Sequence, residues 1–557
     1  MAINSTLRPR LQSSWPSGSK MIRPTFPALL HTQLELVADA NPDKPAFRLD
    51  GASLTYADLA AATSRMARTL VEAGVCRGDR VALFLDRSFE ASIALFGILR
   101  AGAAYVPIDP GASQQRVHEI LDLSDARCLV TTEAKRAALP GGFPASMSAV
   151  IGLSKPLEAE VDVISWEEAL SSPDLGARAQ ALSETDLAYI MFTSGSTGTP
   201  KGIMHTHASG MSYACMAANL YGLHAEDRFS NACGLHFDMS TLDYFCSTLV
   251  GASTTIIPDP WLKLPASLAE LIEAERLTVW YSVPLALLQL VEFGDLGSRD
   301  LSALRIVLYG GEVFVPKHLE TLRRLLPDAL IGNVYGPAET NQCTWFNVPE
   351  GWNADRGPVP IGAACPNADL LVIGEDDADV APGETGELAV RAPTMMQGYW
   401  RQPELNRTAF LERAGAGGET QRYYRTGDIV IERPDGNLDF LGRRDRMVKS
   451  RGFRVELDEV ERAIAGLPMV SEAATFTVAL REGVTVIRGA AILNPEETIG
   501  ARDLAAAVAR LLPHYARPDR IELVPEFPRT GSGKIDRRAL AEQLSGEAQV
   551  SGVVGHA

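Results

Sequence analysis

The stretch Tyr189–His207, "YIMFTSGSTGTPKGIMHTH", joins a short apolar run to a loop of glycine and hydroxyl residues. Its first four residues are apolar, which predicts a short buried strand. The loop over 193–198 carries many backbone N–H and hydroxyl donors, and glycine lets the main chain curve around a ligand without Cβ clashes. Such a loop followed by Lys201 suits a polyphosphate. It is not a Walker A loop, because Pro200 precedes the lysine, and a flexible Ser/Gly surface loop explains the pattern equally well.

Outward from this stretch, strand and helix patterns alternate through the first 350 residues or so. A helix is predicted over 54–74, a buried strand over 80–85 and a second helix over 88–102. This alternation indicates parallel sheets covered by helices. From about Pro382 the pattern changes to short strands and turns, such as "GETGELAVRA" and "PDGNLDFLG". A small final segment combines two helices, "LDEVERAIAGL" and "ARDLAAAVARLL", with two strands.

Composition limits the class of protein. The chain has 557 residues, 46% of them hydrophobic, which is enough for a large core and more than one domain. A net charge of -17 argues against a nucleic-acid scaffold and fits an enzyme of small molecules. No apolar run reaches transmembrane length and no signal-peptide core is evident, so we expect a cytoplasmic protein without membrane contact. The scattered cysteines, without a CxxC pair, indicate a reduced compartment and no zinc site: Cys76, Cys128, Cys215, Cys233, Cys246, Cys343 and Cys365.

Nine short motifs in a fixed order make the sequence specific. They are LTYADL (54–59), LRAGAAYVPIDP (99–110), FTSGSTGTPKG (192–202), FDMS (237–240), VYGPAETN (334–341), GEL (386–388) with GYW (398–400), YRTGD (424–428), GRRDRMVKSRGFRVELDEVE (442–461) and GSGKID (531–536). Together they resemble the adenylate-forming superfamily of acyl-CoA synthetases, luciferases and, most closely, the amino-acid adenylation domains of nonribosomal peptide synthetases. The resemblance covers about residues 27 to 543, so we expect that fold for nearly the whole chain.

The resemblance implies an α/β fold in two parts. A large N-terminal core, 27–443, would contain helix-covered, largely parallel sheets and a small β-barrel-like subdomain. A small α+β lid, 444–543, would pivot at Asp445, bringing the face near Gly452 to the thiol acceptor. Residues 1–26 are rich in Ser, Pro and basic residues and are predicted to be a disordered tail. Residues 544–557 are predicted to be a C-terminal tail.

The resemblance also implies a chemistry of two half-reactions. A carboxylate attacks the α-phosphate of ATP and releases pyrophosphate, and a thiol then captures the acyl-adenylate. Lys534 would bridge the substrate carboxylate and the α-phosphate, and Glu339 would ligate Mg²⁺, which prefers carboxylate and phosphate oxygens. The predicted ATP-binding residues are Thr193, Ser194, Gly195, Ser196, Thr197, Gly198, Lys201, Gly311, Glu312, Asn333, Tyr335, Gly336, Thr340, Asp428, Arg443 and Lys534.

Among these residues the resemblance implies separate roles. Tyr335 would stack on adenine and Asn333 would bond its amino edge. Asp428 would accept the ribose hydroxyls through both carboxylate oxygens, supported by Arg443. The chain departs from the family at Ala338, where a threonine usually touches the α-phosphate. The missing hydroxyl removes one donor, worth roughly 1 kcal/mol.

A second set of residues concerns the acid that is activated. Asp238 of "FDMS" matches the aspartate that pairs with the substrate ammonium in amino-acid activators. A buried unpaired carboxylate costs several kcal/mol, so this position favours an amine and disfavours fatty and aryl acids. The other predicted pocket residues, together with Lys534, are Met239, Leu242, Tyr281, Leu308, Gly310, Val334, Gln342 and Cys343. This apolar set resembles the proline-type code of free-standing prolyl adenylation enzymes that feed pyrrole biosynthesis. Alanine or another small aliphatic amino acid is the alternative.

The acceptor is expected to be a separate protein. Only 23 residues follow Lys534 and no HHxxxDG motif is present, so we expect a free-standing enzyme that loads a phosphopantetheinylated carrier protein in trans. Carriers of the family are acidic, which makes Arg451 and Arg454 candidates for a basic docking patch. Two alternatives stay open: transfer to coenzyme A, which Asp238 disfavours, and a non-catalytic sensor. A sensor would have lost residues such as Lys201 or Glu339, which this chain keeps.

Overall fold

The computed structural model describes residues 22–23, 28–176, 181–193, 199–415, 417–450, 452–481, 484–529 and 535–550. Of the predicted features, the N-terminal tail except 22–23, the loop residues 194–198, Arg451 and Lys534 lie outside the described residues. The chain forms two compact units. Unit 1 is drawn from Met1–Pro110, His118–Phe192 and Lys201–Arg444, and unit 2 from Gly111–Val117, Thr193–Pro200 and Asp445–Ala557.

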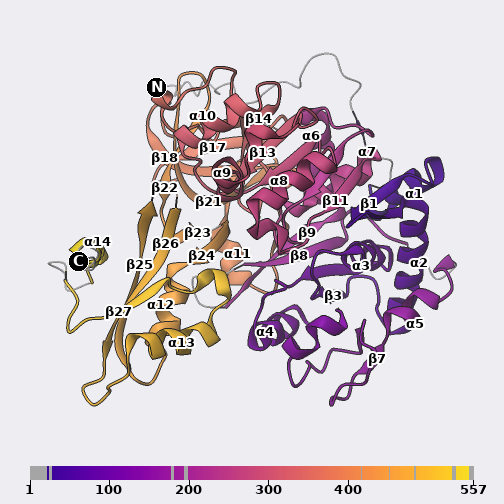
Figure 1. The fold of residues 1–557 in the computed structure, drawn as a ribbon, viewed down its shortest axis with the longest axis horizontal. Helices are drawn as coiled ribbons and strands as arrows, with labels where there is room; N and C mark the ends of the chain where they lie inside the picture. Colours follow the sequence, from indigo (N-terminus) through magenta and orange to yellow (C-terminus); the bar gives the residue numbers. More distant parts are fainter. Residues whose placement is uncertain are drawn as a thin grey trace. The chain divides into compact units, whose positions relative to one another are not determined.

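Unit 1 contains two large sheets with helices packed around them (Figure 1). The nine-stranded sheet has the order β16-β15-β14-β13-β12-β10-β11-β1-β2. The strands are β1 (Pro45–Leu49), β2 (Ala52–Thr55), β10 (Arg228–Asn231), β11 (Ser253–Ile256), β12 (Val279–Ser282), β13 (Ile306–Gly310), β14 (Leu330–Tyr335), β15 (Thr344–Asn347) and β16 (Ala363–Ala364). Pairing is parallel from β1 to β14, while β2, β15 and β16 add antiparallel at the edges. The predicted parallel architecture is therefore confirmed.

The eight-stranded sheet holds the stretch quoted first. Its order is β19-β9-β8-β4-β3-β5-β6-β7. The strands are β3 (Arg80–Leu83), β4 (Ala104–Pro107), β5 (Cys128–Val130), β6 (Ala149–Ile151), β7 (Asp162–Ile164), β8 (Leu187–Thr193), β9 (Lys201–Thr206) and β19 (Gly398–Tyr399). The strand predicted at Tyr189 is β8, so Thr193 ends one strand and Lys201 begins the next.

The helices of unit 1 follow the predicted spacing. They are α1 (Leu30–Ala40), α2 (Tyr56–Glu72), α3 (Phe89–Arg100), α4 (Gln114–Ser124), α5 (Trp166–Ser171), α6 (His207–Tyr221), α7 (Ser247–Val250), α8 (Pro265–Ala274), α9 (Pro284–Phe293), α10 (Pro316–Leu325) and α11 (Pro403–Ala409). Short 3₁₀ turns occur at Glu133–Ala138, Trp261–Lys263, Leu296–Ser298 and Ala354–Arg356. The face of α2 formed by Leu59, Met66 and Leu70 is fully buried. Among the described helices, none is long and apolar enough to cross a membrane.

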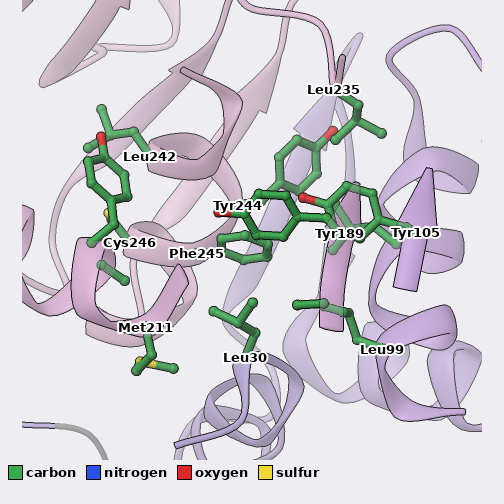
Figure 2. Packing of buried hydrophobic residues seen from close by; sticks show 14 of the residues in the cluster. Leu30, Leu99, Tyr105, Tyr189, Met211, Leu235, Leu242, Tyr244, Phe245 and Cys246 are labelled. Carbon is green, nitrogen blue, oxygen red and sulfur yellow. The ribbon is translucent and has the colours of Figure 1, made fainter. Parts of the chain in front are cut away.

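The largest hydrophobic core of unit 1 collects side chains from many of these elements (Figure 2). Tyr105 of β4 stacks on Tyr189 of β8 with ring centroids 5.4 Å apart, and Phe245 lies 6.1 Å from Tyr189. Phe245 belongs to a single π-helical turn, Leu242–Cys246, which directly follows the "FDMS" motif. The core therefore reaches from the strand before the loop to the predicted amino-acid site.

The rest of unit 1 is a third sheet of five antiparallel strands. The strands are β17 (Asp369–Ile373), β18 (Thr385–Arg391), β20 (Phe410–Ala414), β21 (Thr420–Glu432) and β22 (Leu438–Arg443). Its order is β17-β18-β21-β20, with β22 also paired to β21. The subdomain predicted to be barrel-like is thus an open sheet over the described residues, because its outer strands do not pair with each other.

Unit 2 is a small α+β fold with its own core, as predicted for the lid. Its strands are β23 (Met447–Ser450), β24 (Phe453–Glu456), β25 (Val470–Arg481), β26 (Val484–Leu493) and β27 (Arg520–Leu523). Its helices are α12 (Leu457–Ala465), α13 (Ala501–Leu511) and α14 (Arg537–Val550), with a 3₁₀ turn at His514–Ala516. Ile464, Leu504 and Ile521 join in its buried core. Helix α14 continues to Val550, past the residue where the tail was predicted to begin.

Candidate active site

The phosphate loop is described only at its two ends. The Thr193 hydroxyl is enclosed and has no hydrogen-bond partner among the described residues. Lys201, at the start of β9, is half-buried. A buried hydroxyl without a partner costs free energy, which is regained when a ligand supplies an acceptor. This is consistent with the predicted polyphosphate role of the loop.

Three residues predicted to hold the adenosine are in direct contact. Tyr335 is the last residue of β14, and Asp428 of β21 lies in register with Arg443 of β22. The Asp428 carboxylate accepts hydrogen bonds from the Tyr335 hydroxyl and from the Arg443 guanidinium. Burial, and then the charge of Asp428, raise the pKa of Tyr335 well above its usual value, so this phenol stays protonated. The structure therefore joins the predicted adenine and ribose residues into one buried cluster.

The neighbouring predicted nucleotide residues lie within strand β14 or directly after strands β13 and β14. Asn333 of β14 donates through its side-chain amide to the Pro360 carbonyl at 2.8 Å, which leaves its amide oxygen as an acceptor. An acceptor suits the amino edge of adenine. Gly311 has φ +94°, a conformation that glycine adopts without strain. At Gly336 a Cβ would lie 1.5 Å from the Asn341 carbonyl oxygen, so only glycine fits there.

Glu339, the predicted metal ligand, is fully buried. Its carboxylate accepts a hydrogen bond of 2.7 Å from the Tyr399 hydroxyl, which also lies 3.2 Å from the Tyr424 hydroxyl. Among the described residues no group of three or more His, Cys, Asp or Glu side chains could enclose a metal. A single held carboxylate fits Mg²⁺, because this ion usually takes its other ligands from phosphates and water.

The loop that carries Glu339 is held at three consecutive carbonyls. The Ala338 carbonyl accepts a hydrogen bond from the His205 ring at 2.9 Å. The Glu339 carbonyl accepts one from the Met396 backbone N–H at 2.7 Å. The Thr340 carbonyl accepts one from the Thr394 hydroxyl at 2.7 Å. The hydroxyl of Thr340, a predicted nucleotide residue, donates to the Pro337 carbonyl at 3.2 Å. In this structure Thr340 therefore supports the loop from inside.

Asp238, the predicted amine anchor, is connected to the same loop. The Thr241 hydroxyl donates to the Asp238 carbonyl at 2.6 Å and accepts from the Asn341 amide at 3.1 Å. The Asp238 carboxylate accepts from the Met239 backbone at 3.0 Å. Burial first, and then the charge of Asp238, raise the pKa of Tyr189. The predicted amine anchor and the predicted metal carboxylate thus lie on two linked segments.

Most of the remaining predicted pocket residues belong to the main hydrophobic core of unit 1. Leu242, Tyr281, Leu308, Val334 and Cys343 are buried in one hydrophobic cluster, with Met239 packed against it. They come together because parallel pairing sets Tyr281 beside Leu308 and Gly310 beside Val334. Gly310 has no room for a side chain, since a Cβ would lie 2.4 Å from the Val334 carbonyl oxygen.

Gln342 is the polar member of the predicted pocket. Its side-chain nitrogen donates to the Tyr221 hydroxyl at 2.7 Å. Its side-chain oxygen is buried and has no partner among the described residues. Burial also raises the pKa of the neighbouring Cys343 thiol to about 12, so that residue stays neutral. Among the described members of the predicted pocket, Asp238 is therefore the one with a charged side chain.

The predicted hinge lies between two anchored arginines. Arg444 donates its backbone N–H to the Gly427 carbonyl at 2.8 Å, and its guanidinium lies 3.3 Å from the Glu387 carboxylate. Within unit 2, Arg446 pairs with Asp458 and Glu461 of α12. Residue 445 thus separates an arginine anchored in unit 1 from one anchored in unit 2.

Several residues of the site were not predicted from the sequence. Tyr399 lies in the quoted "GYW" motif, which could have indicated a role. His205 and Tyr189 lie in the first stretch, but a single aromatic residue on a strand usually belongs to the core. No spacing rule links either of them to Ala338 or Asp238.

Within unit 1 the residues predicted to hold adenosine are in direct contact and the predicted metal carboxylate is buried, as expected for an adenylate-forming class of protein. Comparisons with known proteins agree: the family model described as AMP-binding enzyme matches residues 34–400, and that of the AMP-binding enzyme C-terminal domain matches residues 459–534. The chain belongs to the AMP-binding enzyme family.

The similar proteins include two curated ligases and a solved adenylation domain. An L-proline--[L-prolyl-carrier protein] ligase of Pseudomonas fluorescens is 34% identical over 93% of this chain and 100% of its own. A second L-proline--[L-prolyl-carrier protein] ligase, from Streptomyces coelicolor, is 36% identical over 89% of this chain and 93% of its own. The crystal structure of the Vibrio cholerae adenylation domain AlmE, in complex with glycyl-adenosine-5'-phosphate, superposes with TM-score 0.77 at 25% identity, covering 95% of this chain and 100% of its own.

Proposed function

We propose that this enzyme activates L-proline with ATP and then loads the prolyl group onto a separate carrier protein. The observation that carries the proposal is the linkage of Asp238, through Thr241 and Asn341, to the loop that bears Glu339. Two linked segments would then present an amine anchor and a phosphate-side carboxylate to a single acyl-phosphate centre. A site for an acid without an amine has no use for Asp238.

In the first half-reaction the residues bind and orient the two substrates. Asp238 would pair with the ammonium, while Asp428, Arg443 and Tyr335 would hold the adenosine. The proline carboxylate attacks the α-phosphorus, the bond to the β-phosphate oxygen breaks, and pyrophosphate leaves. Glu339 would hold Mg²⁺, whose charge offsets that of the phosphates when bound. The donor-rich loop and Lys201 would stabilise the leaving pyrophosphate, where negative charge accumulates.

In the second half-reaction the thiol of a carrier's phosphopantetheine arm attacks the prolyl carbonyl and AMP leaves. Two features support the choice of substrate and acceptor. The lining around Asp238 is apolar and compact, and burying an unpaired polar side chain there would cost a few kcal/mol. The two ligases compared above are named for proline and for a prolyl carrier protein. A prolyl thioester is the kind of product that a pyrrole-forming pathway would consume.

Alanine or another small aliphatic amino acid is the second candidate. Alanine would leave part of the site unfilled, and each missing methylene is worth roughly 1–3 kcal/mol. We therefore expect alanine to be used one to several orders of magnitude less efficiently than proline in kcat/KM.

The test is ATP–pyrophosphate exchange across a panel of proline, alanine, valine, pipecolate, an aryl acid and a fatty acid. Proline should give the fastest exchange, and Asp238→Ala should lower exchange with every amino acid alike. Faster turnover of alanine, or of an acid without an amine, would refute the proline assignment. Loading assays with a phosphopantetheinylated prolyl carrier and with coenzyme A then decide the acceptor. Absence of exchange with every acid would favour the non-catalytic sensor.

A further inference from the structure

His205 is a buried polar side chain for which the proposed chemistry has no use. It lies on β9, four residues after Lys201, and is 1% exposed. Burial is the main cause that lowers its pKa to about 4, so the ring is neutral at physiological pH. A buried neutral histidine keeps one donor nitrogen and one acceptor nitrogen, and both must be satisfied.

The neighbours of His205 fix which nitrogen carries the proton. The Nε2 atom lies 2.9 Å from the Ala338 carbonyl oxygen, which can only accept, so Nε2 is the donor. The Nδ1 atom lies 3.3 Å from the Ser209 hydroxyl, which can donate to it. The ring therefore has one tautomer and one orientation, and its donor is aimed at the Glu339 loop.

The bond to Ala338 joins two segments that the reaction needs in register. Strand β9 begins at Lys201, directly after the phosphate loop, and residue 338 precedes Glu339. The two other carbonyls of this run are held by Met396 and Thr394, which lie outside the β8–β9 hairpin. Ala338 has no side-chain hydroxyl, so its backbone carbonyl is the group that β9 can hold.

The other face of the imidazole leads toward the amine anchor. The His205 ring stacks on Tyr189 with centroids 4.8 Å apart and planes 20° from parallel. Tyr189, labelled in Figure 2, lies in the core beside Tyr105. Phe245, in the turn that follows the Asp238 motif, has its ring centroid 6.1 Å from that of Tyr189, and the charge of Asp238 adds to burial in raising the pKa of Tyr189. His205 thus contacts neighbours of both substrate-binding ends.

We propose that His205 is a positioning residue that holds the Ala338–Glu339 segment in register with the Lys201 end of β9 for adenylate formation. This inference rests on the proposed function. In this role His205 transfers no proton and does not contact the substrate. The role depends on the Nε2–H donor and not on the aromatic ring.

Two substitutions separate the donor from the rest of the side chain. In His205→Gln the amide nitrogen can reach the place of Nε2 and donate to the Ala338 carbonyl. In His205→Asn the shorter amide can reach only the place of Nδ1, so that carbonyl loses its buried donor. His118→Gln, at an exposed position of α4, is the matched control.

We expect His205→Asn to lower kcat for proline-dependent exchange about tenfold or more and to raise KM for ATP, because an unpaired buried acceptor disturbs the loop. His205→Gln should stay within about threefold of wild type, as should His118→Gln. KM for proline should change little. Calorimetric titration with MgATP, without amino acid, should show an affinity that decreases from wild type to His205→Gln to His205→Asn.

The outcomes are distinct. Equal kcat and equal MgATP affinity in the Gln and Asn variants would overturn the inference, whether both match wild type or both are impaired. A lower melting temperature of the Asn variant with wild-type kinetics would also overturn it, since His205 would then be structural only. If wild type shows no exchange with any amino acid, the proposed function fails, and the MgATP titrations of the same variants still decide the role of His205.

Discussion

At the scale of single residues, the site is built from polar groups that are buried and held by a second side chain. Asp428 is held by Tyr335 and Arg443, and Glu339 by Tyr399. Buried charges need such partners, because an unpaired one costs several kcal/mol. The partners fix the position of each carboxylate before any ligand binds, and they are therefore sensitive targets for mutation.

Tyr399→Phe tests the support of the metal carboxylate. The substitution removes one hydrogen bond to a buried charged acceptor, which is worth roughly 1.5–3 kcal/mol. We expect a fall in kcat for exchange of about tenfold to a hundredfold, together with a higher Mg²⁺ requirement. A Mg²⁺ titration of exchange measures both quantities. Tyr423→Phe, in which the lost hydroxyl bonds Asp369 at 2.7 Å, is the control and should exchange at the wild-type rate.

Three buried histidines should make unit 1 sensitive to acid. Burial is the main cause that lowers the pKa of His205 and of His207 to about 4 and that of His31 to about 3. At pH 7 all three are neutral in the folded chain and mostly neutral in the unfolded chain, so they contribute little difference in stability. Below about pH 6.5 the unfolded chain binds protons that the folded chain does not, so the free energy of unfolding falls with pH until the folded values are reached.

The expected slope is up to about 1.4 kcal/mol per pH unit for each histidine. All seven tryptophans precede residue 401, so tryptophan fluorescence reports the denaturant unfolding of unit 1. The denaturant concentration at the unfolding midpoint should decrease as the pH is lowered from 7 to 5, and His31→Gln should reduce that decrease. The exposed His118→Gln variant should keep the wild-type slope. An unchanged slope in His31→Gln would mean that His31 is protonated in the folded state.

Single residues also show where sequence reasoning ends. Asp238, Glu339 and Asp428 could be predicted because each stands in a motif with a fixed neighbourhood. His205 and Tyr399 acquire their roles from partners more than 50 residues away in sequence, and no local pattern encodes such contacts. Their side chains could be assigned only after the strands had been placed.

At the scale of elements, the predicted pocket residues before and within the π-helical turn that follows "FDMS" differ in burial. Leu242 begins the π-helical turn and is fully buried, whereas Met239 is partly buried. The open five-stranded sheet did not follow from apolar periodicity, because it depends on pairings between distant segments. The π-helical turn did not follow either, because apolar periodicity does not distinguish its i→i+5 hydrogen bonds from those of an α-helix. The alternating strands and helices were predictable, since their periodicity is local.

Met239→Ala and Leu242→Ala should therefore differ. Both should shift exchange toward larger side chains than that of proline. Leu242→Ala should in addition lose about 2–5 kcal/mol of stability, because it leaves a cavity in the core. Exchange profiles over the amino-acid panel and thermal unfolding measure the two effects. Equal stability of the two variants would contradict the burial argument.

The hinge prediction also belongs to this scale. Asp445 lies between Arg444, held by Gly427 and Glu387, and Arg446, held within unit 2. Any rotation must then be absorbed near residue 445. Asp445→Pro fixes φ at this position and restricts the residue before it. We expect exchange to survive better than carrier loading, while Asp445→Ala keeps both. Loading by Asp445→Pro at the wild-type rate would exclude this residue as the pivot.

At the scale of the whole molecule, the chain consists of two units with separate hydrophobic cores. The adenosine cluster, Glu339 and Asp238 all belong to unit 1. Lys534 belongs by sequence to the C-terminal part and lies outside the described residues. If the two half-reactions are divided between the units, unit 1 would hold the substrates, and unit 2 would supply a different functional group for each half-reaction.

Lys534→Ala tests this division of labour. The lysine is predicted to bridge the proline carboxylate and the α-phosphate only while the adenylate forms, so its charge matters in the first half-reaction. We expect the variant to lose most ATP–pyrophosphate exchange. It should still transfer the prolyl group from chemically supplied prolyl-adenylate to the carrier at a rate near that of wild type, because the second step needs the thiol and the bound adenylate. Arg510→Ala, the loss of another basic side chain of the same unit at an exposed position of α13, is the control. If Lys534→Ala slowed both half-reactions equally, the lysine would act throughout the cycle, and the two steps would not be separated between the units.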